Sequence, residues 1–112
     1  MVYEMTTVVL AGPAAFVKEA VQLCEELVQY MHGKSVGHVE FLRSLSGDLM
    51  EVMFLGTYES MDEAEEAYEW RSKDEGYKAI GEKAREIERK YGVAMFWGKG
   101  FTRKYWRAAR ES

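Results

Sequence analysis

The chain has 112 residues, and its composition is that of one packed domain. Apolar side chains make up 47% of it, aromatic ones 13% and charged ones 30%, with a single proline, which is typical of a globular protein and leaves no room for a second domain. A net charge of −4 argues against a nucleic-acid binder, because such proteins carry a basic field. The lone Cys24 excludes an intramolecular disulfide, and no apolar run reaches the length of a membrane span. Together with an N-terminus that lacks the basic start of a signal peptide, these features predict a soluble, cytoplasmic protein without a membrane partner.

The first quarter of the chain predicts a strand followed by an amphipathic helix. Thr6–Leu10 is a β-branched run, and Pro13 suits the first turn of a helix. Apolar residues then recur every three or four positions from Phe16 to Met31, which is the period of a helix with one buried face. Gly33 ends this helix.

A β-hairpin is expected next, because the helical period disappears after residue 36. Two apolar segments flank the turn residues 46–48, which read Ser-Gly-Asp. The expected register pairs Leu45 with Leu49, Arg43 with Glu51 and Phe41 with Met53.

The second half of the chain predicts a helix in two segments. Ser60 and Glu63 have the spacing of a capping box, which satisfies unpaired amides at a helix start. The helical pattern is interrupted at residues 71–76, resumes at Tyr77 and ends at Gly92.

A last strand is predicted at Val93–Trp97, an apolar run of the kind found in buried strands. The predicted domain therefore covers residues 1–98, and residues 99–112 form a basic, aromatic tail. This tail carries five basic and one acidic side chains, whereas residues 59–75 carry eight acidic and two basic ones. Two alternatives follow: a solvated helix with a flexible tail, or a tail that docks onto the acidic helix of its own or a partner subunit.

The order β-α-β-β-α-β predicts an α+β, ferredoxin-like fold, in which four antiparallel strands carry both helices on one face. Its other face should be polar if it meets water. In the third strand neither face is polar: one has Met50, Val52, Phe54 and Tyr58, the other Leu49, Glu51, Met53 and Leu55. Exposure of such a face forfeits several kcal/mol, taken at about 25 cal/mol per Å2. We therefore expect a homodimer in which two sheets pack face to face.

This strand and helix order, with the stretches HGKSVGHVEFLRSLSGDLMEV and TYESMDEAEEAYEWRSKDEGYKAIGEKA, resembles the dimeric alpha/beta-barrel superfamily over about residues 5–98. That superfamily includes antibiotic-biosynthesis-type monooxygenases, haem-degrading monooxygenases, stress-responsive barrel proteins and NIPSNAP-like proteins. The resemblance implies that two subunits join their sheets into a barrel, and that a ligand lies between the sheet and the helices of each subunit. Members differ in activity, so the resemblance leaves the reaction open.

His38 and Glu40 are the first candidates for chemistry. They lie two positions apart in the second strand, so their side chains project from the same face. A histidine beside a carboxylate in an apolar pocket can act as a general base, and Met50, Val52, Phe54 and Tyr58 are expected to line that pocket. His38 and Tyr58 are thus the candidate catalytic residues, with Glu40 and Phe54 beside the substrate. The alternative is a hydrogen-bonded pair at the sheet rim.

Aromatic residues near the helix break form a second candidate group. Tyr68, Trp70, Tyr77 and Trp97 would form a wall for a flat organic substrate, as the resemblance implies for oxygenases of aromatic polyketides. Aromatic residues at helical spacing are otherwise core residues. Arg71 would hold an anionic substrate group or pair with Glu75 four residues on.

We expect no metal site and no cofactor. The two histidines form no metal-binding motif, and His32 has the position of a helix C-cap. Haem-degrading members use an Asn, Trp and His set, whereas this sequence contains no asparagine. The first reading is accordingly a homodimer that binds a small apolar or aromatic molecule. The alternatives are a cofactor-independent monooxygenase and a non-catalytic structural dimer.

Overall fold

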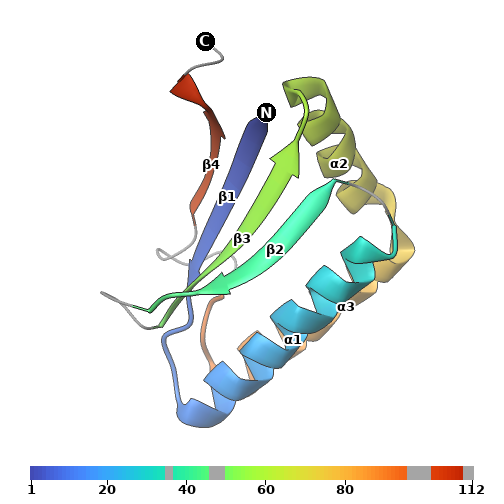
Figure 1. The fold of residues 1–112 in the computed structure, drawn as a ribbon. Coiled ribbons are helices and arrows are strands. Elements are labelled where there is room, and N and C mark those ends of the chain that lie inside the picture. Colours follow the sequence, from blue (N-terminus) through green and yellow to red (C-terminus); the bar gives the residue numbers. More distant parts are fainter. Residues whose placement is uncertain (35–36, 46–49, 96–101, 110–112) are drawn as a thin grey trace.

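The computed structural model describes residues 1–34, 37–45, 50–95 and 102–109, which form two layers (Figure 1). One layer is a four-stranded antiparallel sheet in the order β2-β3-β1-β4, and the helices cover one of its faces. The strands are β1 Val2–Val9, β2 His38–Arg43, β3 Glu51–Tyr58 and β4 Thr102–Arg107; the helices are α1 Ala14–His32, α2 Met61–Lys73 and α3 Glu75–Tyr91. The predicted α+β, ferredoxin-like fold is confirmed. In the described part of the chain, no helix has both the length and the apolar character needed to span a membrane.

The helix boundaries follow local signals in the sequence. Ser60 Oγ accepts a hydrogen bond from the amide of Glu63 at 3.2 Å, as a helix N-cap does. The second helical region is divided, as predicted, because the backbone of Asp74 is extended. The Asp74 carboxylate caps α3 by accepting from the amide of Tyr77, at 3.0 Å, and it also accepts from the hydroxyl of Tyr30 on α1. The break between α2 and α3 is therefore anchored to the first helix.

The position predicted for the last strand was wrong. Residues 93–95 follow α3 without strand structure, and Met95 lies in the core with 1% of its surface exposed; residues 96 and 97 lie outside the described residues. In the described part of this run, only Met95 is buried, and it is not in a strand. The fourth strand is instead Thr102–Arg107. All of its residues are exposed, so its sequence has no apolar run from which the strand could be predicted. Residues 102–107 of the expected tail pair with β1 at the sheet edge, and the boundary at residue 98 falls before a strand of the same sheet.

The register predicted for the hairpin was also wrong, by one residue. Phe41 pairs with Phe54 and Arg43 with Val52, and Ser44 N donates to Glu51 O at 3.2 Å. The expected turn at residues 46–48 and the expected partner of Leu45, Leu49, lie outside the described residues. A shift of one residue moves every side chain of a strand to the other face relative to its partner. Phe41 therefore lies with Phe54 on the helix side, with ring centroids 5.3 Å apart.

Alternate residues of each strand face the helices or the open side of the sheet. The helix-facing residues of β1 and β3 are buried, and those of the opposite parity are half-buried. The main core cluster joins β1 and β3 to α1 and α3 and consists of Val8, Leu10, Phe16, Ala20, Leu23, Val52, Ile80, Ala84 and Met95. The apolar side chains of the open face are Tyr3, Met5, Val9, Leu42, Met53, Leu55 and Trp106. Two polar residues, Glu4 and Thr6, are buried on the helix side.

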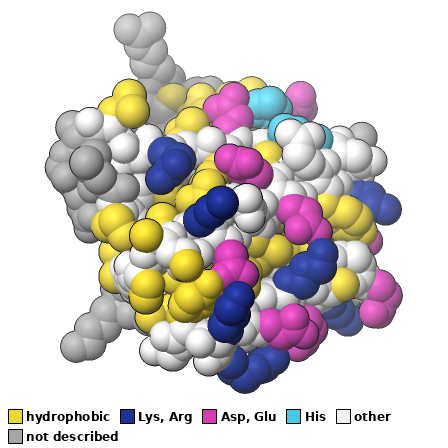
Figure 2. Space-filling model, turned by 90° about the horizontal axis from the view of Figure 1, so that it is seen from below, with side chains coloured by type: hydrophobic (Ala, Val, Ile, Leu, Met, Phe, Trp, Pro, Cys, Tyr) yellow, Lys and Arg dark blue, Asp and Glu magenta, His cyan; other side chains and the backbone are white. Residues whose placement is uncertain are grey.

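Ion pairs connect the two long helices on the surface. Lys83 Nζ lies 2.8 Å from Glu26 Oε1, and Lys90 Nζ lies 3.2 Å from Glu19 Oε2, in both cases between α3 and α1. Figure 2 shows basic and acidic side chains interspersed on the side seen from below, with apolar side chains gathered between them. Exposed pairs of this kind contribute little to stability.

Candidate functional site

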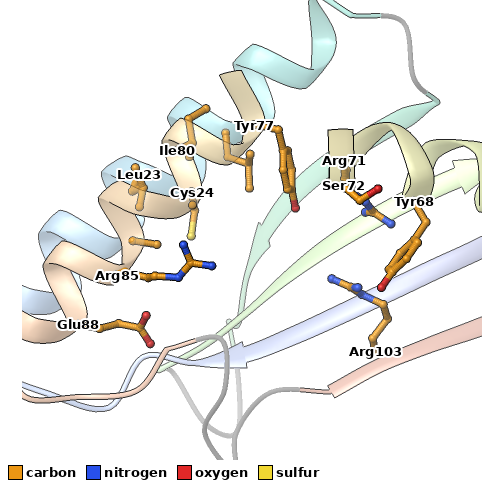
Figure 3. A pocket seen from close by; sticks show the side chains of 13 residues that line it. Leu23, Cys24, Tyr68, Arg71, Ser72, Tyr77, Ile80, Arg85, Glu88 and Arg103 are labelled. Carbon is orange, nitrogen blue, oxygen red and sulfur yellow. The ribbon is translucent and has the colours of Figure 1, made fainter. Parts of the chain in front are cut away.

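A pocket of about 350 Å3 lies between the helical layer and the β4 side of the sheet (Figure 3). Its wall combines apolar residues of α1 and α3 with polar residues of α2, α3 and β4. The apolar lining residues are Leu23, Cys24, Leu27, Ile80, Gly81 and Ala84, and the polar ones are Tyr68, Arg71, Ser72, Tyr77, Arg85, Glu88 and Arg103. A combination of apolar wall and converging polar groups is usual for small-molecule sites.

Small side chains on α3 leave this space open. Gly81 and Ala84 both line the pocket, and a Cβ atom added at Gly81 would meet nothing within 4 Å. The helix packs mainly against α1 and α2 instead of the strands. Because the side chains of β4 are exposed, the sheet is only partly covered on this side. The pocket is therefore bounded mainly by helices, with Arg103 contributed by β4.

A buried carboxylate, that of Glu4, holds the polar end of the pocket in place. Arg71 grips it in a bidentate pair, with Nη1 to Oε1 at 3.1 Å and Nη2 to Oε2 at 3.0 Å. The hydroxyl of Tyr105 donates to Oε2 at 2.7 Å, and that of Tyr58 donates to Oε1 at 3.3 Å. Arg103 Nε lies 3.7 Å from Oε2. Strands β1, β3 and β4 and helix α2 thus converge on one carboxylate.

The electrostatics of this group keep Glu4 ionised. Burial alone would raise the pKa of Glu4, but the hydrogen bonds and charge of Arg71, the hydroxyl of Tyr105 and the charge of Arg103 together lower it below 4.5. Burial and the neighbouring carboxylate raise the pKa of Tyr58 to about 12. At neutral pH the carboxylate therefore carries its charge, and the tyrosine keeps its proton and acts only as a hydrogen-bond donor.

Three of the residues predicted to bind substrate, Tyr68, Arg71 and Tyr77, line the pocket. In Figure 3 the ring of Tyr77 points from α3 toward the sheet, and Arg71 lies beside Tyr68 and Arg103. Arg71 forms its ion pair with Glu4, which is 67 residues earlier in the chain. The sequence had suggested Glu75 as the alternative partner.

The other aromatic predictions fall in the neighbouring core. Trp70 stacks on Tyr30 with ring centroids 6.3 Å apart and meets Tyr77 edge-on at 6.0 Å. Phe54 belongs to the buried cluster of Cys24, Val28, Met31 and Val39. Neither Trp70 nor Phe54 lines the pocket. Trp97 lies outside the described residues.

His38 and Glu40 form a hydrogen-bonded pair, with Nε2 3.2 Å from Oε1, at the exposed edge of the sheet. The side chain of His38 is 65% exposed and that of Glu40 is 51% exposed. The corrected register places both with Thr57 and Leu55 on the open face, and not with Phe54 and Tyr58 as expected. The structure therefore does not bring His38 and Tyr58, the two candidate catalytic residues, together.

Sequence reasoning missed the centre of this site, which consists of Glu4, Arg103 and Tyr105. Glu4 lies in phase with Val2, Thr6 and Val8 along β1, and an acidic residue at the buried parity of a strand is a usable signal for a site. Arg103 and Tyr105 were assigned to a tail. Their spacing of two residues, which places both on the same face of a strand, was therefore not recognised. Within the described residues, no three His, Cys, Asp or Glu side chains come together as a metal ion would require.

Comparison with known proteins identifies the fold. No protein-family model and no curated protein matches the sequence. Among solved structures, a protein of Agrobacterium tumefaciens has a TM-score of 0.70 at 17% identity, covering 100% of this chain and 97% of its own. An uncharacterized NIPSNAP domain protein from Burkholderia xenovorans has a TM-score of 0.69 at 17% identity, covering 97% and 95%. A structure described as an antibiotic biosynthesis monooxygenase has a TM-score of 0.66 at 10% identity, covering 97% and 99%. The chain therefore has the ferredoxin-like α+β fold of NIPSNAP and antibiotic biosynthesis monooxygenase-like proteins.

Proposed function

We propose that this protein binds a small apolar or aromatic molecule in the pocket between its sheet and helices. The observation that carries this proposal is the pocket itself, whose apolar wall of α1 and α3 side chains meets a polar end formed by α2 and β4. A site that buries most of an aromatic molecule needs apolar contact area and a few oriented polar groups, and both are present. Gly81 adds support, because it keeps open a space that almost any other residue would narrow.

Oxygenation of the bound molecule is a second candidate, which the likeness to an antibiotic biosynthesis monooxygenase favours. A general base must come within hydrogen-bond reach of the proton that it removes. Neither His38 nor Tyr58 lines the pocket, and the hydroxyl of Tyr58 donates a hydrogen bond to Glu4. Binding is therefore the function that the geometry supports best. Measured turnover of a bound molecule would favour oxygenation instead.

Ligand binding can be tested at Gly81. The neutral probe is 1-naphthylmethanol, titrated by isothermal calorimetry. We expect Gly81→Leu to abolish binding, because the new side chain enters the open space of the pocket. Gly81→Ala is the matched control: it should keep binding and gain up to about 1 kcal/mol of helix stability. Equal binding by the leucine variant, or no binding by the unaltered protein, would refute the pocket as the site.

We also propose that a second copy of the chain covers the open face of the sheet. The apolar side chains of this face, including Met53, Leu55 and Trp106, make contact with water costly. Its charges are complementary about a two-fold axis, since Glu40 lies on one edge strand and Lys104 on the other. A two-fold axis at the centre of the sheet that runs parallel to the strands brings the β2 edge of one copy toward the β4 edge of its partner.

Native mass spectrometry tests this assembly and reports any retained molecule at the same time. The unaltered protein is expected at the mass of a dimer. Met53→Lys places a charge in the middle of the open face and should give monomers. Gln22→Lys adds the same charge on the exposed surface of α1 and should leave the dimer intact. A monomeric unaltered protein would refute the assembly while leaving the pocket proposal standing.

A further inference from the structure

We infer that the ligand of the pocket carries a hydrogen-bond acceptor, such as a carbonyl oxygen, and that this group accepts a hydrogen bond from the hydroxyl of Tyr77. The inference rests on the proposed function, because it specifies the class of molecule that the pocket would take: a flat apolar body with one acceptor. Its basis is a difference among the polar side chains of the pocket wall, most of which already bond to the protein.

The hydroxyl of Tyr77 differs from most polar groups of the wall in having no protein partner. Within the described residues, Tyr68 and Tyr77 are the polar lining residues whose side chains make no hydrogen bond to the protein. Tyr68 is 53% exposed, so water satisfies its hydroxyl, whereas Tyr77 is half-buried. A ligand that fills the pocket displaces the water around Tyr77 and has to replace its hydrogen bond. The other polar lining residues bond as follows: Arg71 to Glu4, Ser72 to the carbonyl of Glu69, Arg85 to Glu82, Glu88 to the amide of Met95, and Arg103 to Thr6.

A closed set of contacts around the helix break holds the ring of Tyr77. The ring meets Trp70 edge-on with centroids 6.0 Å apart, and Trp70 stacks on Tyr30 at 6.3 Å. The hydroxyl of Tyr30 donates to the carboxylate of Asp74, which also accepts from the amide of Tyr77. Gly76 is required here, because an added Cβ would clash with the ring of Tyr30. Tyr77 therefore points toward the sheet in a fixed orientation (Figure 3) and loses little conformational freedom when a ligand binds.

The guanidinium group of Arg71 makes the hydroxyl of Tyr77 a donor. Burial lowers the pKa of Arg71, but the hydrogen bonds and charge of Glu4, followed by the nearby oxygen of Tyr77, raise it. Because a positive charge attracts the lone pairs of this oxygen, the hydrogen of the hydroxyl points away from Arg71. A carbonyl oxygen in the pocket can accept from it, whereas an N–H or O–H donor of a ligand would compete with Arg71 for the same lone pairs.

The test measures how Tyr77→Phe changes the affinities of 1-indanone and indane, by calorimetry. The two molecules share one bicyclic frame and differ by a carbonyl oxygen, so a change in their affinity ratio reports the bond to this oxygen and cancels the difference in their hydration. Tyr77→Phe should weaken the binding of indanone about fivefold, or by about 1 kcal/mol, and leave that of indane unchanged. Tyr91→Phe is the matched control, because it makes the same change on α3 outside the pocket and should keep the ratio.

The outcomes separate the two proposals. Binding of neither molecule by the unaltered protein would overturn the proposed function, and the inference with it. An affinity ratio that Tyr77→Phe leaves unchanged would overturn the inference alone and leave the pocket as a site for molecules without an acceptor. A ratio that falls equally in Tyr91→Phe, or in Tyr68→Phe but not in Tyr77→Phe, would also overturn it, because the donor would then not be Tyr77. A fall in Tyr77→Phe without one in Tyr91→Phe supports the inference.

Discussion

Replacement of Glu4 by glutamine should destabilise the fold far more than its small change in size suggests. The side chain of Glu4 is 4% exposed and that of Arg71 is 11% exposed. Glutamine keeps the shape but removes the charge, and its amide nitrogen, which is a donor, would face the donors of Arg71 or Tyr105. The variant therefore leaves a buried guanidinium without its counter-ion.

The magnitude follows from the geometry of the pair. At 3.0 Å and an effective dielectric constant of about 20, two unit charges attract by about 5.5 kcal/mol. Desolvation offsets part of this attraction in the intact protein, and removal of one partner of a buried pair costs about 3–5 kcal/mol. A domain of this size has a total stability of about 5–15 kcal/mol, so Glu4→Gln should remove a large share of it.

Urea unfolding followed by circular dichroism, at one fixed protein concentration, measures this cost. Glu26→Gln is the matched control, because Glu26 forms an ion pair of 2.8 Å with Lys83 on the surface, and its loss should cost less than about 1 kcal/mol. The two variants remove the same charge at similar distances and differ in burial. If Glu4→Gln cost no more than Glu26→Gln, the argument from burial would be wrong.

The same residue predicts how stability depends on pH. Folding lowers the pKa of Glu4 from its ordinary value of 4.5, so its contribution is fully present above pH 4.5 and is lost as the pH falls through the folded-state pKa. We expect the free energy of unfolding to fall less steeply below pH 4.5 in Glu4→Gln than in the unaltered protein. Parallel curves for the two proteins would contradict the assignment.

Further predictions concern capping, backbone conformation and the C-terminal segment, all measured by urea unfolding. Ser60→Ala removes the N-cap of α2 and should cost about 1 kcal/mol, whereas no change would mean that the cap is not formed. Gly92 and Gly37 both have positive φ angles, 66° and 84°, but an added Cβ has open space at the first and lies 2.4 Å from the ring of Tyr58 at the second. Alanine should therefore cost about 1–2 kcal/mol at Gly92 from backbone strain alone, and more at Gly37; equal costs would show that the ring moves aside. Deletion of residues 99–112 should abolish cooperative unfolding because it removes β4. An unfolding transition at the original urea midpoint would instead support the prediction from the sequence that these residues are a tail outside the domain.

The order of the elements could be predicted because most of them bury one face. The amphipathic period of α1, the Ser60 cap and the break at Asp74 are local features, and each was visible in the sequence. β4 lacked such a signal, since an exposed edge strand gains its conformation from backbone pairing with β1 and not from burial. Just after α3, Met95 is buried, Val93 is half-buried and Ala94 is exposed, and none of the three is in a strand. An apolar run was therefore mistaken for secondary structure.

The site was harder to predict than the fold because its residues are distant in the sequence. Arg71 and Tyr77 were found from their place beside the helix break, where the chain opens a pocket. Glu4 is one of many acidic residues, and nothing near it in the sequence indicates a partner. Its partners come from β3, α2 and β4, so only the assembled sheet shows that they surround one carboxylate.

The distance along the chain between Glu4 and Tyr105, 101 residues, also bears on the order in which the protein folds. Contacts between remote segments form late, because closing a long loop costs entropy before the contact is gained. Until β4 pairs, the chain can form a three-stranded sheet in which β1, an inner strand of the final sheet, is an unpaired edge. Such edges recruit strands from other molecules. Pairing of β4 is therefore the step that ends the period in which a newly made chain is most prone to aggregate.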